Sequence, residues 1–221
     1  MKGGVTGAFF DVDGTLVASD IVRYGALIRT AEMTGAVRAA WTVGFLPRVL
    51  LYVALDTLSR SAFQRAFYRL YRGVPPDALD ERARALFHHH IEPRLRTRPV
   101  ERVQEHRRRG HRVVLVTGSL EPIVAPLAAY LGANDVLAAR LEVRAGAHTG
   151  RLAEPPLAGE RKGALVVGFA REHGIDLAES FGYADSADDV PMLEAVGHPV
   201  AVAPDRRLRR IALARGWEVL D

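Results

Sequence analysis

Two carboxylates, Asp11 and Asp13, stand two positions apart where an apolar run ends, and Gly14 follows them directly. Carboxylates in such a place can bind a hard cation, act as nucleophiles or transfer protons. A glycine lets the chain turn sharply away from a strand. Alone, the pair could also be a capped turn at a strand end. Its role therefore depends on which other polar residues the fold brings close to it.

Polar residues follow two later apolar runs in the same way. Thr117 and Gly118 come after the run 113–116, and Asp185 and Asp189 come after the run 180–183. The carboxyl ends of the strands of an open α/β sheet form its ligand site. Acids gathered there repel one another unless a cation intervenes, and Mg²⁺ prefers oxygen ligands.

The internal lysine, Lys162, is unusual because the chain holds 28 arginines and only one other lysine, Lys2. A compact ammonium differs chemically from a planar guanidinium. Together with a hydroxyl group and the backbone amides of a glycine-containing turn, it can form a cradle for a phosphoryl group. Metal, cradle and carboxylate together indicate phosphoryl transfer onto a carboxylate nucleophile.

The elements that must position these residues alternate between strand and helix. Short apolar runs predict strands, and helical patterns lie between them. The expected strands are 5–10, 113–116, 180–183 and 199–203, and the expected helices are 99–109, 121–131, 160–173, 188–196 and 206–215. This order predicts an α/β fold with a doubly wound, Rossmann-like parallel sheet. A short strand pair is expected within 135–152.

One long interval breaks the alternation. Between Leu16 and Arg112 the sequence shows amphipathic segments, roughly 20–34, 36–55, 59–72 and 77–90, in place of strands. Such a length is not a simple loop. We therefore predict a core domain of residues 1–19 and 96–221 and an inserted α-helical bundle cap of residues 20–95.

Composition sets broad limits. The hydrophobic fraction is 48%, the charged fraction 25% and cysteine is absent. These values are typical of a globular protein without disulfides or thiolate chemistry. The N-terminus is a poor match to a signal peptide. A cytoplasmic location is expected.

The segment 36–55 is the most apolar of the chain, but it carries Arg38, Pro47 and Arg48. The two charges and the proline disfavour a membrane span. A buried or cap helix is favoured over peripheral contact with a membrane.

The four motifs in this order resemble the haloacid dehalogenase-like phosphatase superfamily. "DVDGTLV" matches its DxDGT[LV] signature, "VLVTGS" its second motif, Lys162 its third, and "YADSADDVPML" its acidic fourth motif. The helical insertion directly after the first motif is similar to the phosphoserine-phosphatase-like branch (subfamily IB). The resemblance spans nearly the full length and is weak only inside the insertion.

The resemblance implies a role for each matching residue. Asp11 would be the nucleophile, and Asp13 the general acid and base. Mg²⁺ would be held by the carboxylates of Asp11 and Asp185 and by the backbone carbonyl of Asp13. Thr117, Gly118 and Lys162 would bind the phosphoryl group, and Asp189 would steady the waters of the metal.

Substrate contacts are less well defined. Phosphoserine phosphatases usually have Asp-Ser-Thr in the first motif, where Gly14 stands here, and Gly-Asp-Gly-x-Asn-Asp in the fourth. The resemblance makes Asp20 a candidate to bind a substrate amine and Arg65 a candidate to bind a carboxylate. Asp20 also fits the start of a helix. The implied substrate is a small phosphate ester, phosphoserine or a related amine-bearing phosphate.

Other polar features have simpler explanations. Ser119 is expected to cap the helix that Pro122 helps to start. His88, His89 and His90 point in different directions on a helix, so they cannot converge on one ion. The basic runs 107–112 and 206–210 are interpreted as solvated helix ends, and no nucleic-acid partner is expected.

The sequence thus predicts an Mg²⁺-dependent phosphomonoesterase that works through an aspartyl-phosphate. One alternative is a phosphotransferase that passes the same phosphoryl group to an alcohol. Another is a receiver-like phospho-acceptor signalling domain. Receiver-type proteins lack the long insertion and the DxDGT pair, which favours the enzyme. The oligomeric state and the physiological substrate stay open.

Overall fold

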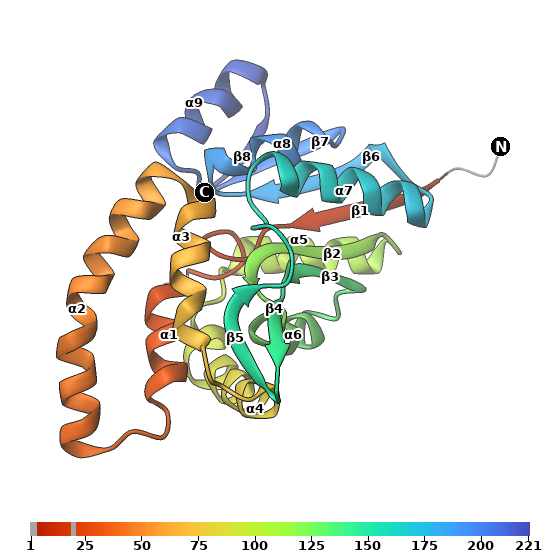
Figure 1. Ribbon diagram of the computed structural model, residues 1–221. Helices are drawn as coiled ribbons and strands as arrows, with labels where there is room; N and C mark the ends of the chain where they lie inside the picture. The colour runs from red at the N-terminus through yellow and green to blue at the C-terminus, as the bar shows by residue number, and fades with distance from the viewer. Residues whose placement is uncertain (1–3, 19–20) are drawn as a thin grey trace.

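A computed structural model describes residues 4–18 and 21–221 of the chain. A parallel six-stranded sheet forms its centre, with the strand order β3-β2-β1-β6-β7-β8 (Figure 1). The strands are β1 (Val5–Phe10), β2 (Arg112–Leu120), β3 (Asp135–Ala139), β6 (Ile175–Ala184), β7 (His198–Val202) and β8 (Glu218–Leu220). A separate antiparallel pair consists of β4 (Leu141–Arg144) and β5 (Ala147–Leu152). The doubly wound α/β fold is therefore confirmed.

Helices cover both faces of the sheet because every central strand is apolar on both sides. On β1, Phe10 packs into one core cluster and Phe9 into the other. The helices of the first face are α5 (Thr97–Arg108) and α6 (Glu121–Leu131); those of the second are α7 (Glu160–His173), α8 (Val190–Glu194) and α9 (Arg206–Arg215). A sheet buried on both faces leaves only its strand ends open for a site.

Two edge strands differ from the sequence prediction. The segment 135–152 was expected to form one strand pair, but β3 leaves it and joins the main sheet beside β2. At the other edge, β8 pairs with β7 and was not predicted. Both strands are short and only partly buried, so their apolar pattern is weak.

Helices fill the interval between β1 and β2. They are α1 (Ile21–Thr30), α2 (Gly35–Leu58), α3 (Arg60–Phe67) and α4 (Pro76–Leu86), with short 3₁₀ and π turns at Tyr68–Tyr71, Phe87–Ile91 and Glu92–Arg94. Aromatic side chains join them: Tyr52 of α2 meets Phe63 and Phe67 of α3 edge-on. Figure 1 shows α1, α2 and α3 side by side at one flank of the sheet, next to the carboxyl end of β1. That β1 end is where Asp11 and Asp13 follow the strand.

Candidate active site

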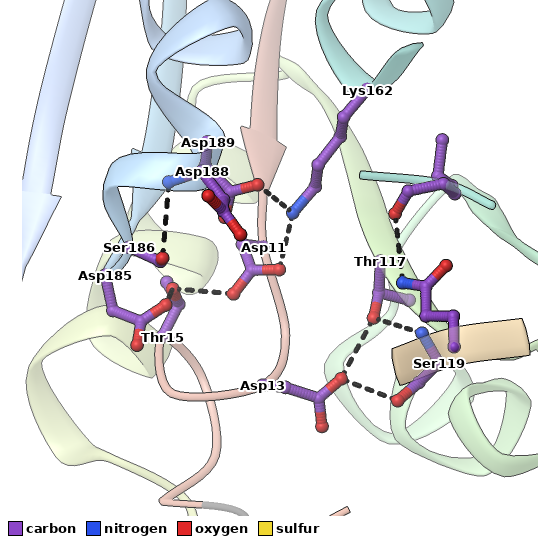
Figure 2. A network of polar contacts seen from close by, with 12 residues as sticks. Asp11, Asp13, Thr15, Thr117, Ser119, Lys162, Asp185, Ser186, Asp188 and Asp189 are labelled. Atoms are coloured by element: carbon purple, nitrogen blue, oxygen red, sulfur yellow. Dashed lines mark hydrogen bonds and ion pairs between the residues drawn. The ribbon is translucent and has the colours of Figure 1, made fainter. Parts of the chain in front are cut away.

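The polar residues that follow the strands meet at one edge of the sheet (Figure 2). Asp11 comes directly after β1, Thr117 lies within β2, and Asp185 follows β6. Lys162 lies in the first turn of α7, and Asp189 in the 3₁₀ turn Ala187–Asp189. The parallel order β2-β1-β6 brings these segments together although up to 178 positions separate them in the chain, from Asp11 to Asp189.

Lys162 joins the two acidic segments. Its Nζ lies 2.6 Å from Oδ1 of Asp11 and 2.9 Å from Oδ1 of Asp189, and only 3% of its side chain is exposed. Burial lowers the pKa of Lys162, but the carboxylates of Asp11 and Asp189 raise it more, so the net shift is upward. The ammonium therefore stays charged and holds Asp11 in one orientation.

Thr15 links Asp11 to Asp185 from the other side. Its hydroxyl donates to Oδ2 of Asp11 at 2.9 Å and lies 3.3 Å from Oδ1 of Asp185. Gly14 has a φ of 93°, and a Cβ there would lie 2.0 Å from Oδ2 of Asp185. A side chain at position 14 would thus displace the Asp185 carboxylate, and the positive φ also favours glycine.

Asp13 faces β2 and not Lys162. Its Oδ2 accepts hydrogen bonds from the hydroxyl of Thr117 at 3.1 Å and from that of Ser119 at 2.6 Å. The prediction that Ser119 caps a helix is wrong: Leu120 is the N-cap of α6, which has no side-chain cap. Ser119 belongs to β2 and stands two residues after Thr117, so both hydroxyls lie on the same side of the strand and reach Asp13.

Three carboxylates form a group suited to a cation. Asp11, Asp185 and Asp189 offer oxygens that all lie within 4.8 Å of one another. Burial, followed by the charges of Asp11 and Asp189, raises the pKa of Asp185 to about 7. Burial also raises the pKa of Asp189, to about 6, although Lys162 opposes the shift. The single ammonium of Lys162 does not neutralise the negative charge of three neighbouring carboxylates. The residues therefore fit a hard divalent cation with oxygen ligands.

Helix α3 covers the site. Arg60, Phe63 and Gln64 of α3 line a cavity of about 50 Å³ together with the acids and Lys162. The Tyr68 hydroxyl donates to the carbonyl oxygen of Gly118, and a Cβ at Gly118 would lie 2.1 Å from Nε2 of Gln64. Gly118 is therefore a point of close approach between β2 and the helical segment.

Asp20 and Arg65 were the two residues predicted to contact the substrate. Asp20 lies outside the described residues. Arg65 is exposed on α3 and lines a separate groove next to β5, so it does not face the acids. The structure instead places Arg60 in the cavity, five residues earlier and on another side of the helix. The helical period alone could not select Arg60, because the sequence does not tell which side of α3 faces the sheet.

Sequence reasoning also gave no role to Thr15 or Gln64 and the wrong role to Ser119. Thr15 lies within the quoted motif DVDGTLV and Ser119 within VLVTGS, so their closeness in sequence to Asp13 and Thr117 was the available signal. Gln64 had no signal, because its contact with Leu157, 3.4 Å from Nε2 to the carbonyl oxygen, joins residues 93 positions apart.

Comparison with known proteins identifies the family. Residues 8–194 match the haloacid dehalogenase-like hydrolase family. The chain is 35% identical over 218 residues to the inhibition of morphological differentiation protein of Streptomyces azureus, covering 98% of this chain and 78% of that relative. It is 32% identical over 222 residues to a phosphoserine phosphatase of Mycobacterium tuberculosis, covering 97% and 70%. A histidinol-phosphatase of Neisseria meningitidis is 28% identical, with 97% of both chains covered.

Solved structures agree. A Bordetella pertussis protein of unknown function superposes with a TM-score of 0.84 at 29% identity and covers 99% of both chains. A phosphoserine phosphatase solved as a phospho-aspartyl intermediate analogue has a TM-score of 0.71 at 20% identity, over 98% and 93% of the two chains. The chain belongs to the haloacid dehalogenase-like hydrolase family, on its phosphoserine-phosphatase-like branch, and is a phosphatase. The receiver-like alternative is thereby set aside.

Proposed function

We propose that this phosphatase is an Mg²⁺-dependent phosphomonoesterase that forms an aspartyl-phosphate on Asp11. The observation that carries the proposal is the buried contact between Lys162 and Asp11, 2.6 Å from Nζ to Oδ1, at the carboxyl end of β1. A buried ammonium restrains the carboxylate and offsets the charge of an arriving phosphoryl group. Asp11 is thus prepared to attack phosphorus.

The reaction has two displacements. An Asp11 oxygen bonds to phosphorus while the bond from phosphorus to the leaving oxygen breaks, and Asp13 gives its proton to that oxygen. Asp13 then takes a proton from water, the water oxygen bonds to phosphorus, and the bond to Asp11 breaks. Inorganic phosphate leaves, and both carboxyl groups return to their first state.

Neighbouring residues bind and orient. The hydroxyl of Thr117, which donates to Asp13 at 3.1 Å, turns to a phosphoryl oxygen, and the Gly118 amide adds a second donor. Ser119, at 2.6 Å, continues to hold Asp13. Asp11, Asp185 and the Asp13 carbonyl would hold Mg²⁺, with Asp189 steadying its waters; the cation would supply positive charge at the phosphoryl oxygens.

The small size of the cavity supports a cap role for residues 20–95. About 50 Å³ is room for one or two water molecules and not for a phosphorylated metabolite. Helix α3 must therefore withdraw from Gly118 to admit the substrate and return to exclude water. Residues 1–19 and 96–221 form the core in this proposal.

The substrate proposed is a small amine-bearing phosphate monoester. Two relatives are named for phosphoserine and histidinol phosphate, both of which carry an amine beside the ester. Arg60, which lines the cavity and pairs with Asp56 at 2.7 Å, replaces Arg65 as the cation that contacts the substrate. The absence of cysteine suits a cytoplasmic location.

The test is phosphate release from a panel of phosphate monoesters, with and without Mg²⁺. Wild-type protein and an Asp77→Asn control, altered at an exposed residue of α4, should release phosphate only with the cation. The proposal fails if an Asp11→Asn variant turns over as fast as these two. Adding an alcohol and analysing the products separates hydrolysis from phosphotransfer.

A further inference from the structure

The outer face of α2 is apolar and exposed over most of the helix. Its large apolar side chains leave 53–83% of their surface in solvent; the most exposed are Val43 (67%), Leu50 (75%) and Leu58 (83%). In an ideal helix Val43, Leu46, Leu50 and Val53 fall within about 80° of arc. Arg38, Arg48 and Asp56 lie on the opposite half. A charge-free face of this length is unusual for a surface that meets only water.

The inner face of the same helix is firmly packed. The rings of Trp41 and Phe45 stack at 4.7 Å, and Tyr52 lies 5.6 Å from Phe67 of α3. By length and composition α2 could cross a membrane, yet a span would remove the contacts of Tyr52 with Phe63 and Phe67 of α3. The helix therefore offers one face outward while the other stays on the protein, which is the arrangement of an interfacial helix.

The helices around this face are strongly basic. Residues 21–72 contain eight arginines and two acids; the arginines are Arg23, Arg29, Arg38, Arg48, Arg60, Arg65, Arg69 and Arg72, and the acids are Glu32 and Asp56. The difference, eight minus two, is a net charge of +6 on the segment that carries the apolar face. Arg38 and Arg48 of α2 are both exposed, so the helix itself carries positive charge beside its apolar face.

We propose that α2 docks this phosphatase on an anionic lipid surface, with the helix lying in the plane of the interface. Apolar side chains would enter the boundary between headgroups and acyl chains, and exposed arginines of the segment, such as Arg38 and Arg48, would meet the lipid phosphates. A second copy of the chain fits less well, because it would bring two segments of +6 together. Pro47 supports a shallow position: its ring removes a helical hydrogen bond to Val43, and water or headgroups can satisfy the freed carbonyl oxygen.

Vesicle flotation of the full chain tests the proposal. The probes are vesicles of phosphatidylcholine alone and of phosphatidylcholine mixed with phosphatidylglycerol. Wild-type protein should float with the anionic vesicles, less at high salt, and much less with the neutral ones. The double variant Leu46→Gln/Leu50→Gln should reduce the bound fraction at least about tenfold. Neither leucine lines the catalytic cavity, so phosphate release from a soluble substrate should persist and report a folded protein.

The matched control is Leu213→Gln. Leu213 is 68% exposed on α9, which is also rich in arginine but has no second large exposed apolar residue; its variant should float like wild type. Equal flotation of the Leu46→Gln/Leu50→Gln variant, equal binding to neutral vesicles, or no flotation at all overturns the proposal. Sedimentation analysis provides a further check: a wild-type dimer that the double variant turns into a monomer would make this face a self-association surface instead.

Discussion

The acidic site and the outer face of α2 meet solvent in opposite ways. At the site, Asp11 and Lys162 are almost fully buried and held by ion pairs and hydrogen bonds. On α2, large apolar residues such as Leu50 lie open to solvent. The first arrangement preorganises charge for a reaction. The second leaves apolar area that only another surface can cover. The acidic site is therefore the part suited to catalysis, and the outer face of α2 is the part suited to docking.

The largest effect should come from the centre of the acidic site. Replacing Asp11 by Asn removes the nucleophile but keeps the size of the side chain. Turnover should fall at least about 10⁴-fold, while a phosphate analogue should still bind. Steady-state kinetics and calorimetry measure the two quantities. Wild-type turnover in this variant would show that Asp11 is not the nucleophile.

The two faces of α2 provide a second test. Phe45 is 4% exposed among aromatic rings, so Phe45→Ala should lower the free energy of unfolding by about 3–4 kcal/mol. Leu50→Ala on the outer face should change it by less than about 0.5 kcal/mol. Denaturant unfolding in the absence of lipid measures both. Similar losses for the two variants would mean that the outer face is packed in solution.

A third test examines another buried polar group of the core, His106. Burial lowers its pKa from 6.5 to about 4, and its Nε2 lies 2.8 Å from the Tyr183 hydroxyl. The unfolded chain therefore binds the proton more readily, and stability should be lost as the pH falls from about 6.5 to about 4. The loss should reach about 3 kcal/mol.

Unfolding curves across this pH range measure the effect of His106. A His106→Gln variant should show a smaller loss, whereas His89→Gln, which alters an exposed residue, should behave as wild type. An unchanged pH dependence in His106→Gln would mean that other groups cause the loss.

The smallest effect concerns the cation. Asp185→Asn leaves Asp11 and Asp189 in place but removes one of the three carboxylates. Activation by Mg²⁺ should need about 10- to 100-fold more cation, and the rise in melting temperature on adding Mg²⁺ should shrink. Unchanged activation would place the cation elsewhere.

The catalytic residues could be predicted from the sequence better than the side chains and helices that surround them. Asp11, Thr117, Lys162 and Asp185 each follow or begin a strongly patterned element, and a parallel sheet must bring such positions to one edge. The partners of these residues depend on side-chain directions that no local pattern encodes, as Ser119 shows by bonding Asp13 instead of capping a helix.

The helical segment was harder to predict for the same reason. Its helices were recognisable from their period, but the side of α3 that faces the sheet is decided by tertiary packing. Arg65 was therefore selected where Arg60 lines the cavity. The apolar character of 36–55 was visible in the sequence, whereas the exposure of its outer face required the structure.

Trapping the aspartyl-phosphate on Asp11 would test the proposed mechanism at its nucleophile. Given an aryl phosphate, whose leaving group needs no proton from Asp13, an Asp13→Asn variant should form the intermediate and hydrolyse it slowly, since the base that activates water is gone. Borohydride reduction of the quenched reaction, followed by peptide mass spectrometry, should then find residue 11 converted to homoserine. Turnover without any modification at residue 11, or modification of a different residue, would show that Asp11 is not the nucleophile.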